Sequence, residues 1–158
     1  MSEKTDVCLT FDAACMAGIE MENRIFQNYV HALRVVKDQA AKEILLEAAQ
    51  SRLTYKHRLE SAVLEGKFDA PLASGPVSVM NLRVRCCDQH QIDAGADARK
   101  ALAYAIQMAQ DALRFYRDMA KNCEGAPMAK LLTELGDEQT RHLQQLEDVF
   151  EEHFLPEG

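Results

Sequence analysis

The sequence is poor in several residue types, and each shortage excludes a class of protein. Its 158 residues include no Trp, only 7 Gly and 4 Pro, and no Cys-x-x-Cys pair among its 5 cysteines. Because helix breakers are so few, long uninterrupted helices are favoured. Without a Cys-x-x-Cys pair, a four-thiolate iron or zinc site is excluded. The odd number of cysteines, without the spacing of a small secreted domain, also argues against a disulfide framework.

Positive charge is also scarce, with 18 Lys and Arg against 25 Asp and Glu and a net charge of −7. An acidic chain has no electrostatic basis for binding nucleic acid or an anionic membrane, so we expect neither partner. No apolar run approaches the roughly 18 residues of a membrane-spanning helix. The first residues lack a basic region followed by an apolar stretch. We therefore predict a cytoplasmic protein, folded as one domain over residues 1–158.

The sequence does contain four long stretches with helical character. They are predicted to cover residues of about 11–36, 39–64, 98–121 and 127–154. The short connections within the first pair and within the second pair predict two antiparallel helical hairpins. A long crossover, residues 66–95, joins the hairpins. The predicted fold is therefore all-α, a four-helix bundle of two hairpins.

An internal repeat supports this organisation. Three identical pairs recur at an offset of 87: Ile19 and Ile106, Met21 and Met108, and Tyr29 and Tyr116. The second and fourth helices are aligned through His57 and His142, at an offset of 85. A difference in hairpin loop length would give the change of two residues. The pattern indicates a duplicated helical hairpin.

Three residues are candidates for a functional site. Glu22 lies seven residues before Tyr29, so both fall on one helix face, where a carboxylate is costly unless it is paired or bound to a cation. His57 and His142 occupy the matching positions of the repeat. Two alternatives remain open at this point. Glu22 is solvated if its face turns outward, and each histidine is a neutral, hydrogen-bonded core residue rather than a metal ligand.

Two segments carry a resemblance to a known family, residues 112–120 (ALRFYRDMA) and residues 132–147 (LTELGDEQTRHLQQLE), with weaker support from residues 19–29. They resemble the ferritin-like, rubrerythrin-related group of four-helix bundles, and the resemblance extends over all four helices. It implies a ferritin-like fold with two iron ions in the bundle core. In that family two helices each give one Glu, and the other two each give a Glu-x-x-His pair.

Carried onto this sequence, the resemblance gives an incomplete set of ligands. The six family positions fall on Glu22, on Thr54 and His57, on Ala109, and on Gln139 and His142. Only Glu22, His57 and His142 retain a ligand. One carboxylate offsets little of the +4 charge of two Fe(II) ions, so we expect no full di-iron centre. At most one ion, iron or zinc, is expected on these three residues.

Two functions of different class follow from the resemblance. The first is a rubrerythrin/ferritin-like protein that has lost the full di-iron centre and is non-catalytic. The alternative is a non-haem iron oxidoreductase acting on oxygen, peroxide or iron, for which no catalytic residue is assigned. If the centre is metal-free, Tyr29 or Tyr116 is expected to donate a hydrogen bond to Glu22, and both histidines are expected to be neutral core residues.

The partners are predicted in the same way. The resembled family commonly forms dimers, and the crossover contains apolar residues that must cover a surface, namely Leu72, Val77, Val79, Met80, Leu82 and Val84. We therefore predict a homodimer. A redox or protein partner is left unidentified.

Overall fold

The computed structural model describes residues 11–65, 90–123 and 129–154, and every regular element in these ranges is an α-helix. The helices are α2 (Phe11–Val35), α3 (Gln39–Glu65), α4 (Ala98–Asn122) and α5 (Ala129–Phe154). The prediction of an all-α chain with four helices is confirmed. Most of the predicted crossover, residues 66–89, lies outside the described residues.

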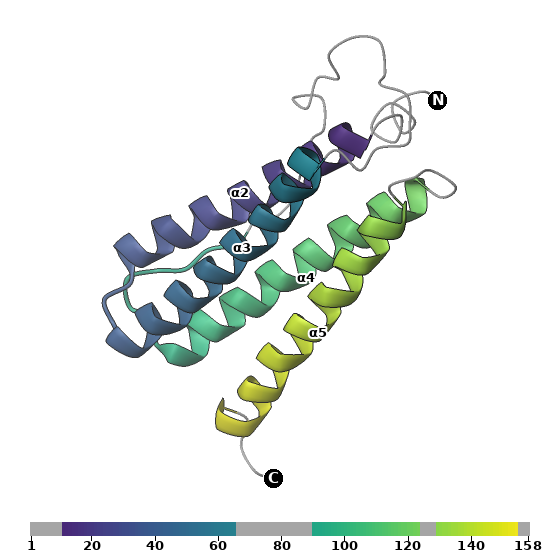
Figure 1. Cartoon of the computed structure of the whole chain (residues 1–158). Helices are drawn as coiled ribbons and strands as arrows, with labels where there is room; N and C mark the ends of the chain where they lie inside the picture. The colour runs from purple at the N-terminus through teal and green to yellow at the C-terminus, as the bar shows by residue number, and fades with distance from the viewer. Residues whose placement is uncertain (1–10, 66–89, 124–128, 155–158) are drawn as a thin grey trace.

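The helices pack as two hairpins. Figure 1 shows α2 beside α3 and α4 beside α5, antiparallel within each pair, while α3 and α4 run in the same direction. The contact between α3 and α4 joins the two hairpins. Lys37 N donates to Ala94 O at 3.3 Å, and the His90 Nε2 atom lies 2.7 Å from Asp111 Oδ2. These contacts attach residues 90–97 both to the α2–α3 turn and to α4.

Aspartates fix where two of the helices begin. The side chain of Asp38 accepts from Ala41 N at 2.9 Å, and that of Asp97 accepts from Lys100 N at 3.0 Å. Each carboxylate satisfies a backbone N–H that has no partner within the first helical turn. Each aspartate directly precedes the first residue of the helix that it caps.

Cys123 ends α4 as its C-cap residue, and its backbone N donates to Met119 O at 2.9 Å. Its side chain is buried and disulfide-bonded. The sequence argues only against a framework of several disulfide bonds, and a single disulfide at Cys123 does not conflict with that expectation. An odd cysteine count excludes complete pairing, but it leaves room for a single disulfide bond.

The buried positions reveal the register of the repeat. α2 and α4 begin 87 residues apart and end 87 residues apart. Buried pairs at the same offset include Met21 and Met108 on these helices, and Leu45 and Leu132, Ala48 and Leu135, and Arg52 and Gln139 on α3 and α5. One offset therefore serves both hairpins. The predicted offset of 85, which matched His57 to His142, is wrong, because His142 corresponds to Tyr55 and both are half-buried.

In the part of the chain that the structure describes, no helix is long and apolar enough to cross a membrane.

Candidate functional site

Four polar side chains meet in the middle of the bundle, one from each helix. They are Glu22 on α2, Arg52 on α3, Tyr116 on α4 and Gln139 on α5, and each is at most 1% exposed. We call these four residues the polar centre. Buried polar groups of this kind destabilise a fold unless they bond to one another.

Arg52 is the hub of the polar centre. Its Nη1 atom lies 3.1 Å from Glu22 Oε1, and its Nη2 atom donates to Gln139 Oε1 at 3.0 Å. The second carboxylate oxygen, Glu22 Oε2, accepts from the Tyr116 hydroxyl at 2.6 Å. The expectation that a tyrosine donates to Glu22 is confirmed, and Tyr116 is the donor.

Burial and neighbouring charge act in opposite directions on the pKa values of Glu22 and Arg52. Burial raises the pKa of Glu22, although Arg52 and the Tyr116 hydrogen bond act to lower it. Burial also acts to lower the pKa of Arg52, but Glu22 and the neighbouring tyrosines outweigh it, so the net shift is upward. The guanidinium therefore keeps its proton, as arginine does in proteins generally. Burial and the adjacent Glu22 together raise the pKa of Tyr116 well above its ordinary value, so its hydroxyl remains a donor.

Two rings lie beside the polar centre. The Arg52 guanidinium lies over the Tyr55 ring, 4.8 Å from its centroid, which is a cation–π contact. The Tyr55 ring meets the His142 ring edge-on, with centroids 6.0 Å apart. Burial, and secondly the charge of Arg52, lower the pKa of His142 to about 4, so this imidazole is neutral at pH 7.

The structure does not bring the three predicted metal ligands together. Glu22 is in the polar centre and His142 lies beside it, but His57 is exposed, with its Nε2 atom 3.4 Å from Ser61 Oγ. His57 is therefore not a buried core residue, and that prediction is wrong. Among the residues with described side chains, no three His, Cys, Asp or Glu residues are grouped so that they could hold a metal ion.

Sequence reasoning missed Arg52, the residue that organises the centre. A buried arginine is rare unless it is paired, so the residue type suggests a surface position. The alignment of His57 with His142 also placed the core position of the second helix two residues too late. It fell on Thr54, which is exposed, instead of on Arg52. The signal that could have found Arg52 is the offset of 87, which pairs it with Gln139.

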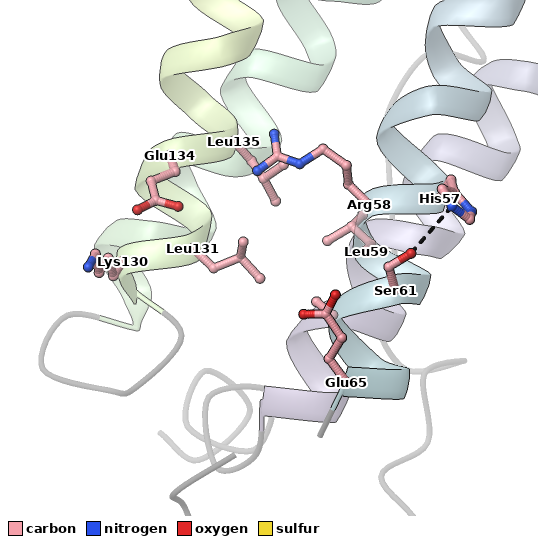
Figure 2. Close-up of a pocket in the computed structure, with 10 residues that line it drawn as sticks. His57, Arg58, Leu59, Ser61, Glu65, Lys130, Leu131, Glu134 and Leu135 are labelled. Carbon is pink, nitrogen blue, oxygen red and sulfur yellow. Dashed lines mark hydrogen bonds between the residues drawn. The ribbon is translucent and has the colours of Figure 1, made fainter. Parts of the chain in front are cut away.

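A cleft of about 560 Å³ lies between the C-terminal part of α3 and the N-terminal part of α5. Figure 2 shows Leu131 directed into it from α5 and Arg58 reaching across from α3, and the polar side chains of His57 and Ser61 also line it. Arg58 also forms an ion pair with Glu138 on α5. The apolar lining residues are Leu59, Ala62, Leu131 and Leu135, and the charged ones are Arg58, Glu65, Lys130 and Glu134.

Comparisons with known proteins give no relative: no family model matches this chain, and no curated protein or solved structure matches it either. Its family and its function therefore have to be argued from its own residues.

Proposed function

We propose that this chain is a ferritin-like bundle in which the polar centre takes the place of the metal centre, and that it acts as a metal-independent binding protein. The observation that carries the proposal is the position of Arg52. Its guanidinium, a fixed positive charge, bonds to the buried carboxylate that a metal site would need.

The corrected register strengthens this interpretation. The resemblance implies a Glu-x-x-His pair on α3 and another on α5. At the offset of 87 these pairs fall on Arg52 and Tyr55, and on Gln139 and His142. Both pairs have the spacing of three residues, and all four side chains lie in or beside the polar centre. Apart from Ala109, the family positions at this offset therefore lie together, but only Glu22 and His142 retain a ligand.

This donor set does not fit a metal ion. Glu22 is the single carboxylate of the polar centre, and both of its oxygens are already bonded, to Arg52 and to Tyr116. A divalent ion there would lie next to the Arg52 cation in a buried site, where like charges repel strongly. We therefore propose neither a di-iron pair nor a single iron or zinc ion on Glu22, His57 and His142. The oxidoreductase alternative needs that metal, so it is not favoured.

The cleft between α3 and α5 is the proposed binding surface. Its volume of about 560 Å³ is within the range of small-molecule sites. Leu131 and Leu59 offer apolar contact, while Lys130 and Glu134 place charge at the edge. This composition suits an amphipathic ligand or the side chains of a partner protein.

Association and location remain predictions. Exposed leucines on α3 support a homodimer, because Leu46, Leu53 and Leu64 are within about 20° of one another around the helix axis. Light scattering at micromolar concentration should give twice the chain mass, and Leu53→Lys should lower it. The cytoplasmic location stays a prediction from the sequence, chiefly from its lack of a long apolar run.

Metal analysis tests the proposal directly. We expect protein purified without chelator to hold less than about 0.1 equivalents of iron or zinc per chain, because the donor set repels a cation. One or two equivalents of iron, lost in Glu22→Gln, would contradict the proposal and favour the oxidoreductase.

A pair of designed variants tests the register. Arg52→Glu, Tyr55→His, Ala109→Glu and Gln139→Glu together restore the six family ligands at the offset of 87. We expect this variant to bind about two Co(II) ions per chain, observed by visible absorption. The matched control uses the offset of 85, with Thr54→Glu, Ala109→Glu and Gln139→Glu, and should bind none in the core, since Thr54 and His57 are exposed. Binding by the control alone would contradict the register.

The cleft has its own test. The dye 8-anilinonaphthalene-1-sulfonate, an apolar anion, should bind the native protein, and Leu131→Glu should weaken that binding by on the order of tenfold. Val149→Glu places the same charge at an exposed apolar position of α5 outside the cleft and should have little effect. Equal effects of the two variants would show that the dye does not use the cleft.

A further inference from the structure

The two halves of the polar centre are not equivalent. In the α2–α3 hairpin, Glu22 accepts a hydrogen bond from Arg52. At the offset of 87 the corresponding residues of the α4–α5 hairpin are Ala109 and Gln139, both buried. Ala109 has no acceptor in its side chain, so the second hairpin lacks the counterpart of the Glu22 carboxylate.

The side-chain amide of Gln139 is left without a hydrogen-bond acceptor among the described residues because this carboxylate is absent. Its Nε2 atom is buried and finds no hydrogen-bond acceptor in the part of the chain that the structure describes. Rotating the amide would not help, because the Oε1 atom accepts from Arg52 Nη2 and the rotated amide would oppose two donors. A buried donor without an acceptor bears its full desolvation penalty, so the amide needs an acceptor.

We infer that the position beside Ala109 and Gln139 Nε2 is a binding site for one internal water molecule, which accepts the hydrogen bond that a carboxylate at residue 109 would accept. Glu22 occupies the equivalent position in the other hairpin with a longer side chain, and Ala109 lacks the side-chain atoms that would fill that position.

Charge decides the class of ligand. Arg52 and Glu22 already balance each other, so a buried anion at this position would leave an unpaired negative charge. A cation would face the Nε2 donor and the guanidinium. A neutral water molecule has neither penalty. The hydrogens of the water also need acceptors, and the candidates in this part of the core are the Glu22 carboxylate and the neutral His142 ring.

Relaxation of water oxygen-17 tests the inference in solution, because a water molecule trapped in a protein for longer than the tumbling time gives a dispersion step. We expect such a step for the native protein. Gln139→Leu should remove it, whereas Gln144→Leu, which changes an exposed glutamine of the same helix, should leave it unchanged. A native protein without the step, or a step that survives Gln139→Leu, would overturn the inference.

A second variant keeps the test valid if Gln139→Leu fails to fold. Ala109→Gln supplies a neutral acceptor from α4, so it should displace the water molecule and abolish the step in a folded protein. A crystal structure of the native protein should show a single water oxygen within hydrogen-bond distance of Gln139 Nε2. Density for an anion there, or a direct bond from Nε2 to a protein oxygen, would overturn the inference.

Discussion

The two hairpins of this bundle have the same pattern of burial but different chemistry at their centre. Met21 and Met108 correspond, and both are fully buried, as are Leu45 and Leu132. The polar positions diverge, with Glu22 against Ala109, Arg52 against Gln139 and Tyr55 against His142. Apolar packing needs only suitable volume, whereas a buried charge needs its specific partner. A repeat can therefore keep its packing while its polar residues change in pairs.

The difference also concentrates charge in one hairpin. The ion pair between Arg52 and Glu22 lies within α2 and α3, while α4 and α5 contribute the neutral donor Tyr116 and the acceptor Gln139. Tyr116 donates a hydrogen bond to Glu22, and Gln139 accepts one from Arg52. These two hydrogen bonds connect the second hairpin to the charges of the first. Substitutions in the charged α2–α3 hairpin should therefore lower the stability of the fold most.

Arg52→Met should have the largest effect. It leaves the Glu22 carboxylate buried without its cation, so we expect the free energy of unfolding to fall by about 3–5 kcal/mol. Urea denaturation followed by circular dichroism measures the change.

The double substitution Arg52→Met with Glu22→Leu is the control. It removes both charges, so it should be less damaging than Arg52→Met alone. Additive losses would mean that the two charges contribute independently to stability, so the first hairpin would hold no coupled ion pair.

The next effect compares two tyrosines that correspond in the repeat. Tyr116→Phe removes the hydroxyl that donates to Glu22 Oε2, so we expect a loss of about 1.5–3 kcal/mol. Tyr29 is also buried, but in the described part of the chain its hydroxyl gives no hydrogen bond to Glu22. Tyr29→Phe should therefore lose less than about 1 kcal/mol. Equal losses in urea denaturation would show that burial, and not the bond to Glu22, sets the energy.

Local signals for the start of helices explain why the fold could be predicted from the sequence. Asp38 and Asp97 directly precede α3 and α4, are residues of the type that caps helices, and cap them in the structure. These signals depend on residues a few positions apart along the chain, so they can be read without tertiary contacts. The same holds for α2 and α4, where three identical pairs fix the offset of 87.

The centre was harder to predict because its bonds join residues far apart in the sequence. The helix face of Glu22 indicates its importance, and the sequence predicts Tyr29 or Tyr116 as its hydrogen-bond donor; the structure shows Tyr116 in that role. Arg52 was missed because nothing in its local sequence indicates that Glu22 and Gln139 surround it. On α3 an exposed leucine, Leu53, directly follows Arg52, so apolar periodicity does not reveal which face is buried.

His142 gives a smaller, pH-dependent effect. Its pKa in the folded protein is about 4, below its ordinary value of 6.5, so the unfolded chain takes up the proton first as the pH falls. Its contribution to stability is therefore complete above about pH 6.5 and is lost as the pH falls toward 4. Because the ring is partly exposed, we expect only about 1 kcal/mol.

His142→Gln isolates this contribution, since Glu22, whose pKa is raised, has the opposite pH dependence and is present in both proteins. The fall in unfolding free energy between pH 6.5 and 4 should be smaller in His142→Gln than in the native protein. His31→Gln, which changes an exposed histidine of α2, is the matched control. A slope that is the same in all three proteins would contradict the half-buried, neutral state of His142.

The smallest effect comes from a glycine in each hairpin, because alanine lowers the backbone entropy of the unfolded chain and favours a helix. A Cβ at Gly136 on α5 would lie 3.5 Å from Arg117 Nε, an ordinary contact, and the corresponding residue of α3, Ala49, is already alanine. Gly136→Ala should therefore raise the unfolding free energy by about 0.5–1 kcal/mol.

At Gly18 on α2 a Cβ would meet Leu59 Cδ1 at 2.8 Å, so Leu59 must move and the gain should be cancelled. Thermal unfolding of the two variants measures the difference. A larger gain at Gly18 than at Gly136 would show that the two hairpins do not share the packing that the common offset implies.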